Sequence, residues 1–346
     1  MMLSMITTPL ISIIIPVYNA QRTIGRALDS LTNNDYDIEI IAVNDGSTDA
    51  SEEIINQKVR IDNRIQQIVQ ENGGAARARN VGIQNTHGGY VLFCDSDDEY
   101  SDGLLRCIIE DIEELTPDYI VFDRRTVYDN GTGFSWLKNQ ERTVWKELDW
   151  TEYFNSIMPN RNHSHVVFNK AYRSQIIKEH QIKFNEELML CEDLYFNFAY
   201  LQYARNMVED GRAEYLQHKG PSSLTAGKRK DYYFQDIRVL DILAREYSDD
   251  IGQFDDFVHW HILHQAVNAI DRALMGRDAS SLSEKREIVL SIVNDSKFQD
   301  AYKKAVRNVS DYERNKLVLI YHRLFFAYYL RYLYLPRIKG KIFRHG

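Results

Sequence analysis

Short apolar runs alternate with amphipathic stretches up to Phe122, and this alternation limits the fold more than any other feature of the chain. Five runs rich in Ile, Val, Tyr and Phe are too short for helices and predict buried strands: Leu10–Ile15, Ile38–Val43, Ile65–Val69, Tyr90–Cys94 and Tyr119–Phe122. The stretches between them predict helices: Arg22–Leu31, Ala50–Gln57, Ala75–Gln84 and Gly103–Leu115. Alternating strands and helices predict an α/β fold with a mostly parallel, Rossmann-like sheet and flanking helices.

The pattern changes after Phe122. Residues 123–146 are polar, contain Asn130-Gly131 and predict a hairpin or an irregular flap. The next expected elements are a short strand, two helices and a hairpin turning at Asp210-Gly211: Val166–Phe168, Arg173–His180, Leu194–Tyr203 and 206–217. From Asp231 onward the pattern is helical.

These changes predict two domains. The first covers residues 1–228 and consists of two halves, at about 9–123 and about 124–228. The second is a helical C-terminal domain over residues 229–346.

Charge and cysteine content narrow the possible partners and compartment. The chain has 42 Lys and Arg against 50 Asp and Glu, a net charge of −8, so no nucleic-acid partner is expected. Cys94, Cys107 and Cys191 lack the paired spacing of a zinc site or a disulfide framework, which favours the cytoplasm. The apolar run at Leu10–Val17 is shorter than the roughly 20 residues that cross a bilayer, so no membrane-spanning segment is expected.

Polar residues follow four of the predicted strands at their carboxyl ends, where a parallel sheet binds ligands. The four loops contain Pro16-Val17-Tyr18-Asn19, Asn44-Asp45-Gly46-Ser47, Asn72-Gly73-Gly74 and Asp95-Ser96-Asp97-Asp98. We expect them to converge on one edge of the sheet, called here the rim.

The last of these loops predicts a divalent cation. Three carboxylates within four residues, Asp95, Asp97 and Asp98, repel one another unless positive charge lies among them. Magnesium and manganese prefer oxygen ligands and bridge one or two carboxylates to substrate phosphates. Capping of the following helix is the alternative, although Ser101 and Asp102 are closer to that helix and are expected to cap it.

Two of the other loops suggest contacts with a nucleotide. Asp45 stands on a tight turn, where its carboxylate can accept hydrogen bonds from a base or a ribose, or form an Asx turn. Gly73 and Gly74 open a helix that carries Arg77 and Arg79, which is a weak signal for an anion site. The sequence lacks the glycine fingerprint of dinucleotide binding, which speaks against a nucleotide-dependent oxidoreductase.

In this order, the motifs Ile-Pro-Val-Tyr-Asn, Asn-Asp-Gly-Ser-Thr-Asp, Asn-Gly-Gly-Ala-Ala-Arg-Ala-Arg-Asn-Val-Gly and Asp-Ser-Asp-Asp closely resemble family 2 of the glycosyltransferases, which have the GT-A fold. Phe168–Arg173, Lys183-Phe184 and Glu192–Phe196 extend the resemblance, which covers roughly Pro9 to Thr225. It implies inverting transfer of a sugar from a nucleotide sugar, expected to be a UDP-sugar, to a hydroxyl of a glycan or glycolipid. A catalytically silent module that binds nucleotide sugars or glycans is the alternative.

The resemblance also implies residue roles. Residues 1–228 correspond to the catalytic domain, with the nucleotide-binding half at about 9–123 and the acceptor half at about 124–228. Asp193 matches the catalytic base, with an ordinary N-cap as the alternative, and Glu192 beside it is expected to bind the acceptor or to brace the loop. Asp97 matches the ligand of a Mn²⁺ or Mg²⁺ ion, and His218 is a second candidate ligand, with a structural histidine as the alternative. The residues expected to bind the nucleotide sugar are Pro16, Tyr18, Asn19, Asp45, Asn72, Arg79, Asp95 and Ser96.

Two departures bear on the nucleotide. Asn44 and Gln21 stand where the family usually has an acidic residue and often a glutamate. Neither position is the proposed metal ligand or the base, so the departures affect the expected fit to the nucleotide and not the expected activity.

Residues 317–344 interleave eight aromatic with six basic side chains. This composition suits an anionic membrane surface, and packing on its own domain or on a partner subunit, as in a homodimer, is the alternative. The family resemblance alone suggests bacterial surface polysaccharide synthesis, with a lipid-linked acceptor at the inner face of the cytoplasmic membrane.

Overall fold

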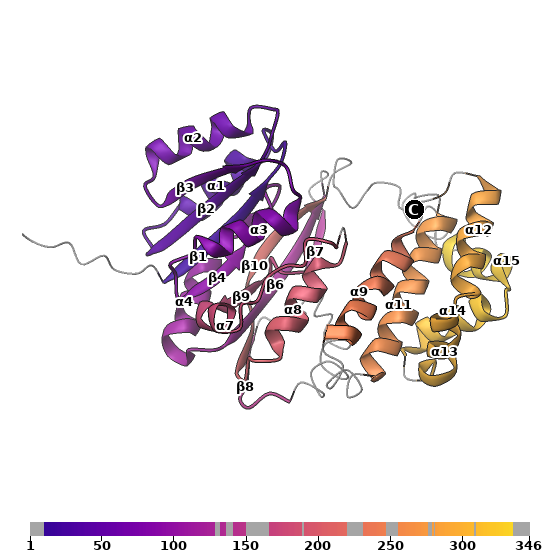
Figure 1. Cartoon of the computed structure of the whole chain (residues 1–346). Coiled ribbons are helices and arrows are strands. Elements are labelled where there is room, and N and C mark those ends of the chain that lie inside the picture. The colour runs from indigo at the N-terminus through magenta and orange to yellow at the C-terminus, as the bar shows by residue number, and fades with distance from the viewer. Residues whose placement is uncertain are drawn as a thin grey trace, which may run out of the picture. The chain divides into compact units, whose positions relative to one another are not determined.

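The computed structural model describes residues 10–128, 132–135, 141–149, 166–188, 190–219, 231–246, 255–275, 279, 281–307 and 309–334. The chain divides into two compact units, Met1–Gly220 and Pro221–Gly346. The domain boundary predicted at residue 228 lies outside the described residues and stays a prediction. Figure 1 shows the sheet and its helices from indigo to rose, and the helical unit in orange and yellow.

Four parallel strands form one side of the sheet in the first unit. They are β1 (Ile11–Val17), β2 (Ile38–Asp45), β3 (Ile65–Gln70) and β4 (Tyr90–Phe93). They lie in the order β3-β2-β1-β4, and each neighbouring pair is parallel. All of β4 and nearly all of β1 is buried, as expected of strands covered on both faces. The predicted α/β fold is confirmed.

Helices follow each of these strands, as the sequence predicts. They are α1 (Ile24–Thr32), α2 (Ser51–Ile61), α3 (Ala75–Gln84) and α4 (Leu104–Leu115). The buried face of α1 is Ile24, Ala27, Leu28 and Leu31, which is the predicted helical spacing. Helix α3 packs against β1 closely enough that a Cβ at Gly82 would lie 2.4 Å from the Ile14 side chain.

The predicted cap of α4 is wrong. Helix α4 begins after Gly103, which has a φ of 85° and makes no side-chain cap. The Ser101 hydroxyl instead accepts a hydrogen bond from the backbone N–H of Glu214 (3.1 Å). Ser101 thus links the acidic loop to a distant strand, where sequence proximity alone suggested a local role.

The other side of the sheet is mixed. Its strands are β5 (Glu99–Tyr100), β6 (Tyr119–Tyr128), β9 (Lys170–Arg173) and β10 (Met207–Lys219). Strand β9 lies between β4 and β6 and is antiparallel to both, so it joins the two sides of the sheet. The predicted strand at Val166–Phe168 is therefore misplaced by a few residues.

The predicted hairpin at Asp210-Gly211 is also wrong. Strand β10 continues through this position and pairs in parallel with β6 on both sides of a bulge between Asp210 and Glu214. The Asp210 carboxylate accepts hydrogen bonds from the backbone N–H of Arg212 (2.9 Å) and from its guanidinium (2.8 Å). These bonds stabilise the bulge. Asp210 and Gly211 therefore bend the strand locally and do not reverse the chain direction.

The described parts of 123–146 pair with strands on this side of the sheet, and they include the predicted hairpin. The short strand β7 (Gly133–Ser135) makes an antiparallel hairpin with β6. Strand β8 (Arg142–Trp145) pairs with the first half of β10. Helices α7 (Ser174–Glu179) and α8 (Glu192–Leu201) complete the described elements of this unit.

The second unit is helical in all its described elements, as predicted. They are α9 (Tyr232–Glu246), α11 (Asp255–Leu274), α12 (Leu282–Val293), α13 (Ser296–Ala305), α14 (Asp311–Tyr321), α15 (Phe325–Tyr328) and the π-helix η4 (Tyr329–Tyr334). Helix α11 is central and packs against α9, α12, α13 and α14. Among the described helices, none combines the length and the apolar character needed to cross a bilayer.

Candidate active site

The loops that follow β1 and β2 are joined by hydrogen bonds at the rim. The Asn19 N–H donates to Ser47 Oγ (3.0 Å), and Asn19 Oδ1 accepts from the Thr48 N–H (2.8 Å). Asn19 has a left-handed backbone with a φ of 50°, which asparagine tolerates. Tyr18 remains 53% exposed beside this junction, so its side chain is accessible from solvent.

Asp45 organises the third loop of the rim. Its carboxylate oxygens accept hydrogen bonds from the backbone N–H groups of Gly73 and Gly74, each at 2.8 Å. The Asn72 side chain donates to the Asp45 carbonyl (3.0 Å). The N–H groups proposed from sequence as an anion site thus bind an internal anion, the Asp45 carboxylate. The roles of Asp45 and Asn72 toward a nucleotide stay predictions.

Arg79 of α3 connects three carboxylates that are distant in sequence. Its Nη1 lies 2.9 Å from Glu192 Oε1 and 3.2 Å from Asp193 Oδ1, and its Nη2 lies 3.2 Å from Asp95 Oδ1. Arg79 is only 5% exposed. Arg79 thus links Asp95, which is predicted to bind the donor, to Asp193, the predicted base, and to its neighbour Glu192. The sequence had assigned Arg79 itself to the nucleotide.

Two further contacts hold Arg79 and the segment opposite it. The Arg79 guanidinium carbon lies 5.3 Å from the centre of the Phe184 ring, and that ring stacks on Phe196 of α8. Asn80 accepts a hydrogen bond from the Phe184 N–H (2.8 Å) and donates to the Phe184 carbonyl (2.9 Å). The segment before α8 is therefore fixed to α3, which carries Arg79.

Asp193 lies in the first turn of α8, where the helix dipole favours a negative charge. Burial raises its pKa, the charge of Arg79 opposes this, and the negative charges of Glu192 and Asp95 add to it, so the pKa of Asp193 is raised to about 7. A carboxylate with a pKa near neutrality is suited to accept and release a proton.

The acidic loop after β4 is held by β10. The Tyr215 hydroxyl donates to Asp98 Oδ2 (2.8 Å), and the His218 N–H donates to Asp98 Oδ1 (2.8 Å). The Tyr215 hydroxyl also accepts a hydrogen bond from the Asp95 N–H (3.0 Å). Burial, followed by the charges of Asp95 and Asp97, raises the pKa of Asp98 to about 9. Asp98 therefore has a structural role, because its carboxyl group connects the acidic loop to β10.

The donor set around Asp97 fits a hard cation. Asp97 is half-buried, and burial together with the charge of Asp95 raises the pKa of its carboxyl group. A cation bound there would relieve this excess of negative charge. In the part of the chain that the structure describes, no three or more His, Cys, Asp or Glu side chains are grouped to hold a metal ion. An ion held by one or two carboxylates and the substrate phosphates does not need such a group.

His218 faces the carboxylate of Glu99. Its Nε2 lies 2.6 Å from Glu99 Oε1, and the guanidinium of Arg26 lies 2.9 Å from the same oxygen. Arg26 also donates to the Asp97 carbonyl (2.8 Å). His218 is thus near the acidic loop and paired with Glu99, and its role as a metal ligand stays a prediction.

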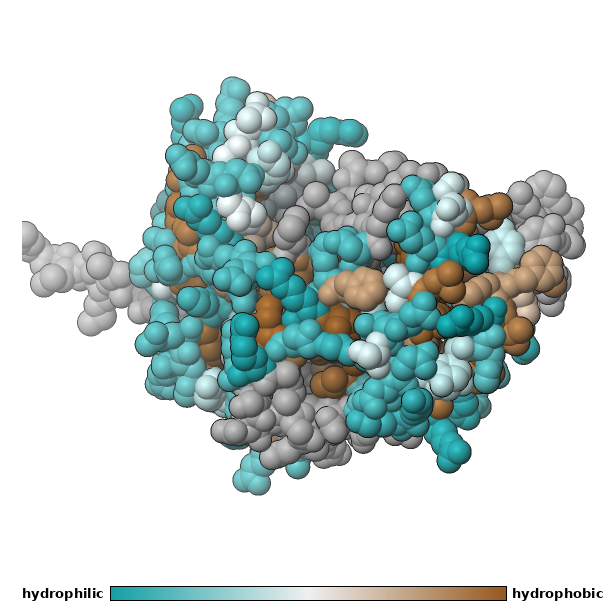
Figure 2. Space-filling view, turned by 45° about the vertical axis from the view of Figure 1, so that its right-hand side comes forward, coloured by the Kyte–Doolittle hydropathy of each residue, from teal (hydrophilic) through white to brown (hydrophobic). Residues whose placement is uncertain are grey.

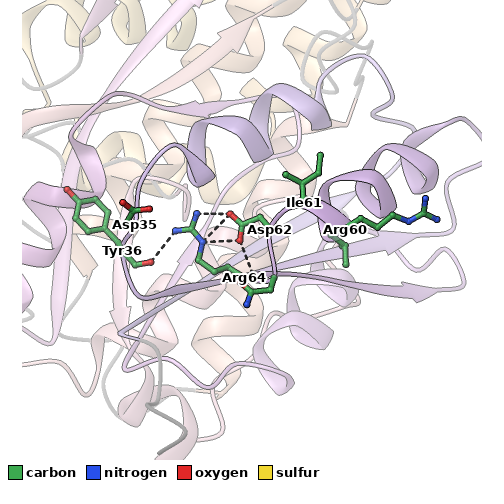
Figure 3. Close-up of a pocket in the computed structure, with 8 residues that line it drawn as sticks. Asp35, Tyr36, Arg60, Ile61, Asp62 and Arg64 are labelled. Carbon is green, nitrogen blue, oxygen red and sulfur yellow. Dashed lines mark hydrogen bonds and ion pairs between the residues drawn. The ribbon is translucent and has the colours of Figure 1, made fainter. Parts of the chain in front are cut away.

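A pocket of about 470 Å³ lies elsewhere in this unit. Its lining residues, Asp35, Tyr36 and 59–64, precede strands β2 and β3, so they lie at the opposite ends of these strands from the rim. Arg64 bonds Asp62 and the carbonyl of Tyr36 (3.2 Å), which ties the two loops together (Figure 3). We regard this pocket as part of the scaffold.

The family follows from a direct match. Residues 12–181, which contain the four rim loops, match the profile of Glycosyl transferase family 2. The chain belongs to glycosyltransferase family 2. This glycosyltransferase is 32% identical over 227 residues to the uncharacterized glycosyltransferase EpsJ of Bacillus subtilis. That match covers 63% of the chain and 63% of EpsJ, so it spans less than two thirds of this relative.

Two other relatives extend the comparison. The sequence is 29% identical over 270 residues to TarS, a poly(ribitol-phosphate) beta-N-acetylglucosaminyltransferase of Staphylococcus aureus, covering 74% of the chain and 45% of TarS. The crystal structure of S. aureus TarS 1–349 with UDP-GlcNAc matches with a TM-score of 0.67 at 22% identity, over 96% of this chain and 92% of that one. The mannosyltransferase PcManGT of Pyrobaculum calidifontis, in complex with GDP-Man and Mn²⁺, matches with a TM-score of 0.52 at 12% identity, over 90% and 86%. These structures show the GT-A fold of the glycosyltransferase.

Sequence reasoning did not identify three residues that shape the site: Asn80, Phe184 and Tyr215. Asn80 carried a usable signal, because a polar residue one turn after Ala76 lies on the apolar face of its helix. Tyr215 carried none, since its partner Asp98 is 117 positions away. Phe184 was noted within a motif, but nothing local indicates that it packs on an arginine.

Proposed function

We propose that this glycosyltransferase moves a sugar from a UDP-sugar to an acceptor hydroxyl, with inversion at the anomeric carbon. The observation that carries the proposal is the position of Arg79, which lies within 3.2 Å of both Asp95 and Asp193. A donor bound at the acidic loop and a hydroxyl activated by Asp193 would then meet at one place on the rim. Asp193 as the one base proposed for the acceptor hydroxyl favours a single displacement.

In the proposed step, the acceptor oxygen attacks the anomeric carbon and forms the new glycosidic bond. The bond from that carbon to the diphosphate oxygen breaks, and its electron pair leaves with UDP. The acceptor proton passes to the carboxylate of Asp193, whose raised pKa of about 7 suits this transfer. An α-linked donor gives a β-linked product.

The rim residues supply the proposed donor site. Tyr18, which is 53% exposed, would stack on the base, with Pro16 and Asn19 beside it, and Asp95 and Ser96 would contact the ribose. Asp97 would hold a Mn²⁺ or Mg²⁺ ion, with His218 as a weaker candidate. When bound, such an ion neutralises negative charge on the departing diphosphate, an effect worth several kcal/mol.

The relatives support the donor class and the setting. TarS was solved with UDP-GlcNAc and is named for a poly(ribitol-phosphate) acceptor, which supports UDP as the nucleotide and a cell-surface polymer as the product. We propose a glycan or lipid-linked acceptor at the inner face of the cytoplasmic membrane. The three cysteines are free thiols, which is compatible with a reducing compartment.

A ligand-binding experiment tests the donor and the metal together. UDP-sugars with Mn²⁺ should raise the melting temperature more than GDP- or dTDP-sugars, because a ligand at about 100 times its Kd stabilises a folded protein by about 2.7 kcal/mol. The same incubation should release UDP slowly by hydrolysis if the chain is an enzyme. Stabilisation without any turnover would instead favour the silent binding module.

Asp97→Ala should remove the Mn²⁺-dependent part of this stabilisation, because the proposed ligand of the ion is lost. Asp102→Ala is the matched control, since Asp102 is an exposed acid five residues further along. Both variants are measured by thermal shift with UDP, with and without Mn²⁺. An equal metal response in Asp97→Ala and the wild type would exclude Asp97 as the ligand.

The pH dependence tests the base. We expect kcat/KM to rise with pH through about 7 and then level, because Asp193 accepts a proton only when it is ionised. The charged groups acting on it are Arg79, Glu192, Asp95 and Lys170. Glu192→Gln removes a negative neighbour that raises the pKa of Asp193, so the rise should move to lower pH. A profile that is flat through pH 7 in both proteins would contradict Asp193 as the base.

A further inference from the structure

Exposed apolar side chains gather in the second unit at the end of α14, in α15 and in the π-helix η4. Phe326 is 79% exposed and Leu324 51% exposed, and Val318, Tyr329 and Leu330 are exposed beside them in sequence. We call these five residues the tail patch. Figure 2 shows brown, apolar residues that reach the surface among hydrophilic ones. Large exposed apolar patches mark binding faces, and five exposed apolar residues within one short segment make the tail patch a candidate for such a face.

The inner face of the same segment is fixed. Tyr328 is buried, and its hydroxyl donates to Asp271 Oδ1 of α11 (2.5 Å). Lys316 of α14 lies 2.7 Å from the other carboxylate oxygen of Asp271 and within 5.8 Å of the ring centres of Tyr312, Tyr328 and Tyr332. These contacts hold α15 and η4 on α11, so the outward direction of the tail patch is set by the fold.

The segment that carries the tail patch is basic in an otherwise acidic chain. Residues 317–346 contain six Arg and Lys and no Asp or Glu, whereas the whole chain has a net charge of −8. Arg323 and Arg331, both exposed, lie within the described part of this segment. The other four basic residues, at 337–344, lie outside it. An apolar patch within a basic segment is complementary to a surface that is both apolar and anionic.

We propose that the tail patch binds the surface of an anionic lipid bilayer. A bilayer interface offers acyl chains for Phe326, Leu324 and Leu330 and phosphate groups for the arginines. A soluble anionic polymer would satisfy the charges and leave the apolar side chains in water. A second copy of the chain would bring two segments of charge +6 together, which is unfavourable.

The test is co-sedimentation of the full chain with vesicles of phosphatidylcholine, with and without phosphatidylglycerol. The wild type should bind only the anionic vesicles, and added salt should weaken binding. Phe326→Ser should lower the partition at least about tenfold, since an aromatic side chain leaves the apolar phase. Arg323→Gln with Arg331→Gln should lower it by about fivefold per charge removed.

Leu282→Ser is the matched control, because Leu282 is 86% exposed on α12 of the same unit. It should bind vesicles as the wild type does. Melting temperatures and UDP-sugar hydrolysis in solution should be unchanged in Phe326→Ser and in Leu282→Ser, so this inference is tested independently of the proposed reaction.

Three results would overturn the proposal. The first is equal vesicle binding by Phe326→Ser and the wild type. The second is a dimer in light scattering that Phe326→Ser dissociates, without vesicle binding by either protein. The third is binding of soluble polyphosphate that depends on the two arginines but not on Phe326, again without vesicle binding.

Discussion

Asp193→Asn is expected to lower kcat by about 10²–10⁴-fold, the usual contribution of a general base, while the Kd for UDP stays nearly unchanged. The amide keeps the shape of the carboxylate, and its oxygen can still accept a hydrogen bond from Arg79, which now lies 3.2 Å from Asp193 Oδ1. Only the ability to take a proton from the acceptor is lost. The measurements are product formation at saturating substrates and UDP titration by calorimetry.

Glu192→Gln is the companion variant for this experiment. Glu192 contacts the same nitrogen of Arg79, at 2.9 Å, and is adjacent in sequence, but we assign it to the acceptor. It should raise KM for the acceptor more than it lowers kcat. If Asp193→Asn loses UDP binding and turnover together, Asp193 supports the structure and is not the base.

Arg79→Met is expected to destabilise the fold by about 3–5 kcal/mol, because removing one partner of a buried ion pair leaves the other charge uncompensated. Three carboxylates contact this guanidinium, and Asp193 and Glu192 are mostly buried. Loss of the positive charge also raises the pKa of Asp193 further, so the residual activity should rise only at higher pH. Denaturant unfolding and a pH–rate profile measure the two effects.

Two controls separate charge from geometry. Arg77→Met removes an exposed arginine from the same helix and should leave both quantities nearly unchanged. Arg79→Lys keeps the charge but not the planar fork that reaches several carboxylates, so it should fall between the wild type and Arg79→Met. If Arg79→Met has the same free energy of unfolding as Arg77→Met and the same pH–rate profile as the wild type, Arg79 does not organise the site.

The sequence was sufficient where structure depends on near neighbours. The spacing of Ile24, Ala27, Leu28 and Leu31 predicted the buried face of α1, and the apolar runs predicted the strands β1 to β4. Prediction from the sequence failed where a residue far away along the chain determines the local structure. Asp210-Gly211 is a strong turn signal, but both sides of it pair with β6, and the predicted hairpin became a bulged strand.

The candidate site shows the same division. Ordered motifs were enough to nominate the acidic loop and Asp193, because each motif is local. The link between them was not predictable, since Arg79 and Asp193 are 114 positions apart and nothing in either segment indicates the contact. Similarly, Asp98 was considered as a helix cap, whereas Tyr215 of β10 binds it.

Strands β9 and β10, which come late in the first unit, limit where the chain can be cut into fragments. The acidic loop belongs to the first hundred residues, yet Tyr215 and the His218 backbone hold it, and β9 occupies the centre of the sheet between β4 and β6. A fragment that ends near residue 123 therefore lacks the strands that shape its own acidic loop. During synthesis, the acidic loop could take this arrangement only after residue 218 has emerged.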